Sequence, residues 1–147
     1  MSAGSSATEL IFFITSVIIA MSVVGALFMN VESITGASTI SSKTLTEQLK
    51  TDITIINDPR IIYYSGGNYS FYVKNTGTQE LVTDYVTVLL DGKMIPETDL
   101  NKTVDGSQTW KTGDVLIIKA KVTLSTGDHN LRIITQNGIE DTFPFTI

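Results

Sequence analysis

The chain begins with a long apolar segment, and a different pattern follows it. Residues 10–29 (LIFFITSVIIAMSVVGALFM) contain no charge, no proline and no amide side chain. At a rise of about 1.5 Å per residue, twenty helical residues reach about 30 Å, which is the hydrocarbon thickness of a bilayer. The pattern predicts a single transmembrane helix at 10–29 that contacts lipid through large side chains, among them Leu10, Phe12, Phe13, Ile18, Val24 and Phe28.

Residues 1–9 form a short tail before this predicted helix. A cleaved secretory signal is the alternative, but the tail carries no Lys or Arg and the apolar run is longer than an ordinary signal core. Gly4 and Glu9 resemble the processing region of type IV pilin-like precursors, in which a glycine precedes the cleavage point and a glutamate stands at the fifth mature position. The basic residues that those precursors carry before the glycine are absent here. Glu9 is equally explained as an interfacial acid in the first helical turn.

Residues 30–50 are polar, rich in Ser and Thr and free of proline. Val31, Ile34, Leu45 and Leu49 fall on one stripe at helical spacing. We therefore expect a stalk in which the membrane helix continues outward and frays near Gly36. A flexible linker is the alternative.

After Thr51 the apolar period changes to two, and turn signals recur about every ten residues. The pattern predicts eight strands, at 52–56, 60–64, 69–75, 80–90, 93–95, 114–124, 129–135 and 139–145. Two of the turns between them, Asp91-Gly92 and Asn137-Gly138, favour two-residue type I′ hairpins. Residues 51–147 are thus predicted to form an all-β domain, an immunoglobulin-like antiparallel β-sandwich without a disulfide.

Composition narrows the range of functions. The chain has 147 residues, a formal net charge of −5 and no cysteine. An acidic chain is unsuited to bind nucleic acid, and a chain without cysteine has no disulfide, thiolate nucleophile or Cys-bound metal.

A search for catalytic residues gives no candidate. His129 is the sole histidine and stands in an expected turn, where a solvated side chain is the usual interpretation. Four aspartates, Asp91, Asp99, Asp105 and Asp114, lack the spacing of a calcium loop, and no phosphate-binding or metal-binding motif occurs. We expect no enzyme activity, no metal and no cofactor.

Interaction features remain. A sandwich has open edge strands that another chain can extend, so adhesion or self-association is the physical default. Trp110 is either a partner contact or a plug over one end of the sandwich. Asn68 and Asn101 each begin an Asn-x-Ser/Thr sequon and are candidate glycosylation sites. Sequons favour an outward location of the β-domain, although all ten basic residues follow the helix and a simple positive-inside count favours the opposite.

Three segments together resemble the FlaG/FlaF family of archaeal flagellar (archaellum) proteins. They are ATELIFFI at 7–14, LKTDITIINDP at 49–59 and FYVKNTG at 71–77. The resemblance covers essentially the whole chain and is closest to FlaG. It implies a static, non-catalytic stator part with one span in the cytoplasmic membrane and a β-sandwich in the pseudoperiplasm of the cell envelope. The implied partners are a FlaF-like sister protein, further copies of the chain and, indirectly, the surface-layer protein.

Two other functions stay open from the residues alone. The first is a filament subunit of archaellin or pilin type, in which residues 10–29 pack in a filament core; Gly4 and Glu9 favour it. The second is a membrane-tethered ligand-binding or hydrolytic domain, which would need a polar cleft with perturbed acids.

Overall fold

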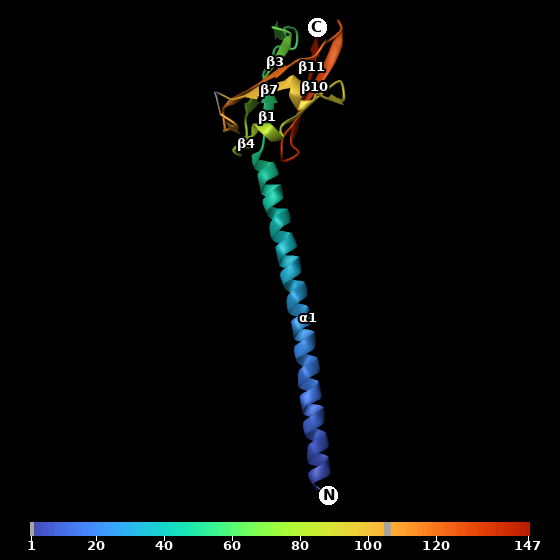
Figure 1. Ribbon diagram of the computed structural model, residues 1–147. Coiled ribbons are helices and arrows are strands. Elements are labelled where there is room, and N and C mark those ends of the chain that lie inside the picture. The colour runs from blue at the N-terminus through green and yellow to red at the C-terminus, as the bar shows by residue number, and fades with distance from the viewer. Residues whose placement is uncertain (1, 105–106) are drawn as a thin grey trace. The chain divides into compact units, whose positions relative to one another are not determined.

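A computed structural model describes residues 2–104 and 107–147. The chain divides into two compact units, Met1–Lys43 and Thr44–Ile147. The described residues of the first unit are all helical, and the second unit holds the end of the same helix and every strand among the described residues. Figure 1 labels these elements along the chain.

Helix α1 runs without interruption over Ser2–Lys50. No proline occurs in this stretch, and threonine hydroxyls in the stalk bond back to the preceding turn: Thr35 Oγ1 donates to Val31 O at 2.8 Å, and Thr39 Oγ1 to Thr35 O at 2.9 Å. The expected fraying near Gly36 is therefore wrong, and residues 30–50 are helix instead of linker. Residues 2–9, expected as a tail, form the first turns of the helix, while Met1 lies outside the described residues.

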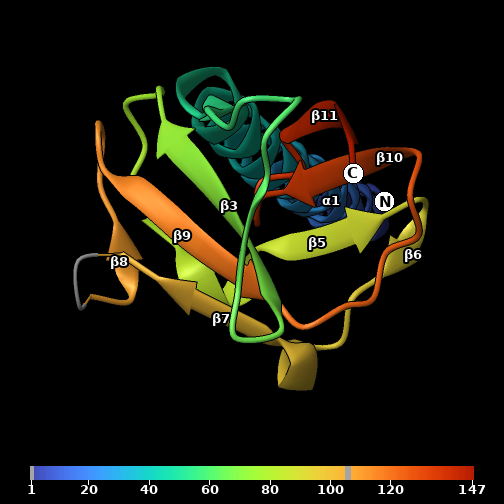
Figure 2. The same cartoon turned by 90° about the horizontal axis from the view of Figure 1, so that it is seen from above.

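The strands form two main antiparallel sheets and a small pair, which can be followed in Figure 2. The first sheet has the order β1-β3-β9-β7, and β2 is also paired to β3. Its strands are β1 (Ile53–Ile55), β2 (Tyr63–Ser65), β3 (Asn68–Asn75), β7 (Leu100–Thr103) and β9 (Val115–Ala120). The second sheet has the order β11-β10-β5-β6. Its strands are β5 (Thr87–Leu90), β6 (Lys93–Met94), β10 (Asp128–Ile134) and β11 (Glu140–Thr146). Strands β4 (Leu81–Val82) and β8 (Thr109–Trp110) pair apart from them, and two 3₁₀ turns, η1 (Thr83–Tyr85) and η2 (Glu97–Asp99), connect strands.

The inward-facing side chains of both sheets make one core. Phe71 of β3 and Phe145 of β11 meet edge to face with ring centroids 5.5 Å apart. Leu116, Ile118 and Leu131 are fully buried beside them. The antiparallel immunoglobulin-like sandwich predicted after an apolar helix is thus confirmed, because alternating residues place one apolar face of each sheet inward.

Several strand predictions were wrong in detail. The single strand expected at 80–90 is broken by η1 into β4 and β5, and the strand expected at 114–124 ends at Ala120. Strands β7 and β8 were not predicted. Strand β7 escaped notice because its alternate residues are Leu100 and Lys102, and a lysine at an inward position does not follow the apolar pattern.

The two predicted hairpin turns differ. Asp91 and Gly92 both have positive φ, 50° and 76°, as a type I′ turn requires. At Asn137-Gly138 only Gly138 has positive φ, 77°, so the type I′ prediction is wrong there. The Gly138 N–H bonds to Thr135 O and the Thr135 N–H to Ile139 O, which is the longer hairpin loop with a glycine in the left-handed region.

Candidate anchor, joint and interaction surfaces

Helix α1 presents an apolar surface that nothing in its own unit covers. Within the described residues it is the one helix long and apolar enough to cross a membrane. The six predicted anchor side chains are each more than half exposed: Leu10, Phe12, Phe13, Ile18, Val24 and Phe28. The serine and threonine hydroxyls of this segment bond to carbonyls of the same helix, so they leave no polar group unsatisfied in lipid.

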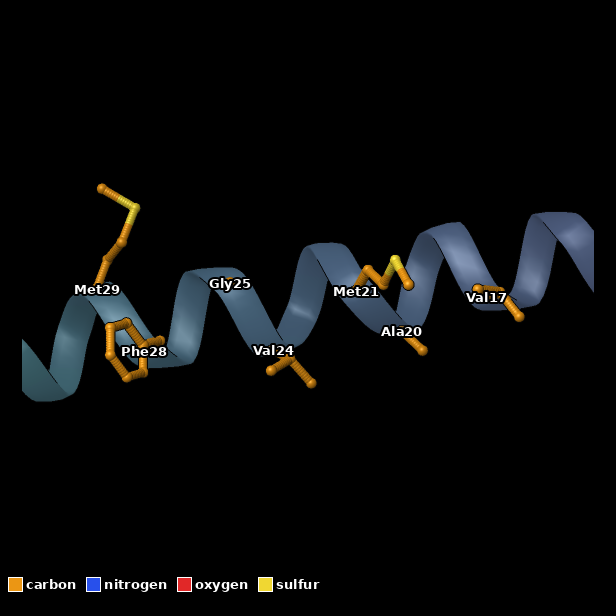
Figure 3. A pocket seen from close by; sticks show the side chains of 7 residues that line it. All are labelled: Val17, Ala20, Met21, Val24, Gly25, Phe28 and Met29. Carbon is orange, nitrogen blue, oxygen red and sulfur yellow. The ribbon is translucent and has the colours of Figure 1, made fainter.

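A shallow apolar groove follows one side of this segment (Figure 3). Two small residues, Ala20 and Gly25, line it together with Val17, Met21, Val24, Phe28 and Met29. Small residues allow a second helix to approach closely in a membrane. The groove is therefore a candidate helix-helix contact.

Gly4 and Glu9 both lie in the first turns of α1 and are exposed. The Gly4 carbonyl accepts the Thr8 hydroxyl at 2.9 Å. Processing after Gly4 stays a prediction.

The second candidate site is the joint, which we define as the contact of the last helical turn with the segment 75–79 inside the unit Thr44–Ile147. A helix leaves its last carbonyls without partners. Here Lys50 O accepts the N–H groups of Thr78 at 2.8 Å and Gln79 at 3.0 Å, and Gln48 Nε2 donates to Asn137 O at 3.1 Å. The helix end is thus hydrogen-bonded into two loops of the β-domain.

Gly77 makes this contact sterically feasible. A Cβ at Gly77 would lie 2.5 Å from both Asp52 N and Lys50 O, which are backbone atoms. The Gly77 N–H donates to Asp52 O at 2.9 Å. Only glycine allows two backbone segments to approach so closely.

The side chain of Asn75 stabilises the segment 75–79 by hydrogen bonds. Its side chain is fully buried, and Nδ2 donates to Gln79 O at 2.9 Å and to Trp110 O at 3.0 Å, while Oδ1 accepts the Gly77 N–H at 3.1 Å. The Asn75-Thr76-Gly77 sequence therefore builds the joint, a role that sequence reasoning missed because its partners are distant in the chain.

Trp110 lies in the core, and its backbone carbonyl accepts the hydrogen bond from Asn75. Its ring is fully buried and Nε1 donates to Asp114 O at 2.9 Å. A fully buried indole offers no surface to a partner, so the expected partner contact at Trp110 is corrected to a core residue that supports the joint.

The edge strands β1 and β11 are closed by side chains. Asp141 Oδ2 accepts the Ile55 N–H of β1 at 2.8 Å, and its Oδ1 accepts the Thr142 N–H at 2.9 Å. Farther along β11, Pro144 has no N–H to offer, and the Thr146 N–H donates to Pro59 O at 3.1 Å. These two edges have few free donors for another strand.

The opposite edges are short or carry charge. Strand β6 has two residues, and β7 has four. Lys102 of β7 points inward, where Nζ donates to Glu97 Oε1 at 2.8 Å and to Val86 O at 3.0 Å. An inward-pointing charge on an edge strand discourages strand addition. Association by strand addition is therefore disfavoured at these four edges, contrary to the physical default inferred from sequence.

His129 is not a solvated turn residue. It lies on β10 with a side chain 9% exposed, and its ring bonds Asp91 Oδ2 through Nδ1 at 2.7 Å and Ser125 O through Nε2 at 2.8 Å. The Ser125 carbonyl and then the Asp91 carboxylate raise the pKa of His129, and the bond from His129 and then the Asn130 N–H lower the pKa of Asp91. The His129–Asp91 pair thus connects the Asp91-Gly92 turn with β10.

The two sequons differ in exposure. Asn101 is exposed on β7, whereas Asn68 is half-buried and its Nδ2 donates to Gly66 O at 3.2 Å. Glycosylation at either residue stays a prediction. Asp105 lies outside the described residues. In the described part of the chain no group of three His, Cys, Asp or Glu could hold a metal.

These features define a β-sandwich protein with an N-terminal helix that is long and apolar enough to cross a membrane. The archaeal-type flagellin family model matches residues 3–145, so the chain belongs to this family. Two curated relatives that are named flagella-related protein G confirm the resemblance to FlaG proteins.

Two relatives are named "Putative flagella-related protein G". One, from Methanocaldococcus jannaschii, is 32% identical over 93% of this chain and 92% of its own length. The other, from Methanococcus voltae, is 30% identical over 92% of this chain and 93% of its own length.

Two solved structures from Sulfolobus acidocaldarius also match. The archaellum periplasmic stator protein FlaG has a TM-score of 0.47 and 17% identity over 65% of this chain and 99% of that chain. The complex of the stator proteins FlaF and FlaG has a TM-score of 0.43 and 20% identity over 61% of this chain and 90% of that chain.

Proposed function

We propose that the chain is a membrane-anchored structural component of the archaellum, a static link between the cytoplasmic membrane and the cell envelope. The observation that carries this proposal is the joint: one continuous helix ends with its last carbonyl bonded to Thr78 and Gln79. A link that resists torque must carry load from its helix into its folded domain, and the bonds between the last helical turn and the segment 75–79 give it a path. The family match and the relatives named flagella-related protein G support a role in the archaellum.

The proposed link has no catalytic step. Its partners are a FlaF-like sister protein, further copies of the chain through the groove on α1, and the surface-layer protein reached indirectly through the sister protein. The β-domain lies outside the cytoplasmic membrane, in the pseudoperiplasm, and the N-terminus lies inside.

Topology is tested by cysteine labelling, because the chain has no native cysteine. Thr98→Cys, on the exposed turn η2, and Ser6→Cys, near the start of α1, are made separately in the full chain. A membrane-impermeant maleimide is expected to label Thr98→Cys in intact cells and Ser6→Cys only after lysis. The opposite labelling pattern would place the β-domain in the cytoplasm and refute a link to the envelope.

Partnership is tested by purifying the full chain from detergent-solubilised membranes. The FlaF-like protein is expected to co-purify with it in a fixed ratio. A chain recovered alone from gently solubilised membranes would contradict the proposed assembly.

A further inference from the structure

The outward face of the sheet β1-β3-β9-β7 is apolar at its centre. The Ile56 N–H donates to Tyr72 O at 2.9 Å, and Tyr72 is paired with Ile117 of β9, so these three side chains form one row across the sheet. Tyr63 of β2, opposite Ser70, lies on the same face. An antiparallel sheet that faces water normally alternates to polar residues at such positions.

These apolar side chains are accessible. Ile56 is 50% exposed and Tyr63 is 60% exposed, while Tyr72 and Ile117 are half-buried within the flat surface of the sheet. Contiguous exposed apolar residues on a soluble domain mark an interaction site more often than isolated ones do.

Lysines flank this row on both sides. Lys74 is opposite Val115 and Lys119 is opposite Ser70, two register positions to either side of the row and therefore on the same face. Both are exposed, and neither takes part in an ion pair among the described residues. We call Ile56, Tyr63, Tyr72, Ile117, Lys74 and Lys119 the lysine-flanked face.

The lysine-flanked face carries positive charge, whereas the chain as a whole is negative. The chain has a net charge of −5, yet the outward positions of β3, β9 and β7 contain no acid. Asp52 at the margin accepts the Thr76 hydroxyl at 2.6 Å. A local positive potential on an acidic protein favours partners of negative charge.

We propose that the lysine-flanked face docks an acidic surface of a partner protein. The inference rests on the proposed role as a link and names the chemistry of one partner contact. An apolar centre with a charged rim is the usual anatomy of a protein interface, and complementary charge gives it specificity.

Two other occupants fit less well. A second copy that docked through the same face would bring two positively charged faces together, because a two-fold contact uses the same patch on both copies. A membrane surface requires apolar side chains that protrude into the lipid, whereas Tyr72 and Ile117 are recessed in the sheet.

The test places a photoreactive group on the face in the full chain. Thr103, exposed and opposite Ile117, is changed to Cys and labelled on intact cells with a benzophenone maleimide. Thr142→Cys, exposed on the outward side of the other sheet, is the matched control. We expect Thr103→Cys to cross-link at least fivefold more strongly than Thr142→Cys, to a protein whose linked peptide is rich in Asp and Glu.

Charge-reversal variants distinguish an effect of the lysines on this face from an effect of the net charge of the chain. Lys74→Glu with Lys119→Glu is expected to lower the cross-link yield more than tenfold, and Lys93→Glu with Lys111→Glu, which changes net charge equally elsewhere, is expected to leave it unchanged. Trp110 fluorescence checks that each variant is folded.

Four results would overturn the proposal: cross-linking to lipid, cross-linking to another copy of the chain, no cross-link above the control, or equal loss with both lysine pairs. Retention of the chain in the envelope is measured in the same cells. A chain that stays in the envelope without the cross-link refutes only the docking face, whereas loss from the envelope refutes the proposed link itself.

Discussion

Gly77→Ala tests the joint directly. The new Cβ would stand 2.5 Å from Asp52 N and Lys50 O, so the backbone of the joint has to move. Overpacking of this kind costs about 1–3 kcal/mol. Displacement also weakens two hydrogen bonds, Gly77 N–H to Asp52 O and Thr78 N–H to Lys50 O, at about 1 kcal/mol each. We expect a loss of about 3–5 kcal/mol, a large part of the 5–15 kcal/mol that stabilises a typical domain.

The loss is measurable by thermal unfolding of the full chain in detergent micelles. Trp110 is the sole tryptophan and is fully buried, so its emission reports unfolding of the β-domain. For a domain of this size, 3–5 kcal/mol lowers Tm by more than about 10 °C.

Gly36→Ala is the control, because no atom lies within 4 Å of its added Cβ and alanine favours helix by about 1 kcal/mol. Its Tm is expected to equal or exceed that of the wild type. If Gly77→Ala unfolds at the wild-type temperature, the close approach of the two segments is not part of the native joint.

Three further changes have expected outcomes. Asn75→Ala removes the side-chain donor to the Gln79 and Trp110 carbonyls, so unfolding in guanidinium should show a loss of about 2–4 kcal/mol; an unchanged midpoint would mean that Asn75 does not stabilise the joint. His129→Gln removes the pair with Asp91, whose stabilising effect needs a protonated His129 and an ionised Asp91. Because the pKa of His129 is raised, its contribution is complete below about pH 6.5 and is lost as pH rises through the raised pKa. Because the pKa of Asp91 is lowered, its contribution is complete above about pH 3.9 and is lost as pH falls through the lowered pKa. The Tm difference from wild type should thus be largest between about pH 4 and 6.5 and shrink by pH 9, and a constant difference would contradict it. Asp141→Ala frees the Ile55 N–H, so size-exclusion chromatography should show more self-association; an unaltered profile would mean that Asp141 does not guard this edge.

The parts of the fold that depend on local pattern were predictable from the sequence. The helix follows from a stretch without proline, and the Asp91-Gly92 turn follows from the need for positive φ. Strand β7 was not predictable, because Lys102 points inward to Glu97 and to backbone carbonyls that only the fold brings together.

The role of the joint also could not be predicted from the sequence. The sequence singled out Asn75-Thr76-Gly77 as a family feature, but its function depends on Trp110, distant in the chain, and on the helix end. His129 was interpreted as a solvated turn residue because its two acceptors are not recognisable from spacing. Contacts between distant segments, and not propensities, decide these roles.

The central claim is that the chain is a static anchor and not a filament subunit. The most direct measurement is to shear the external filaments from cells and quantify this chain in the filament and envelope fractions by mass spectrometry. The proposed link predicts that the chain remains in the envelope fraction and is absent from the filaments. Abundance in the sheared filaments, with the chain starting at Ser5, would contradict it and identify a pilin-like subunit.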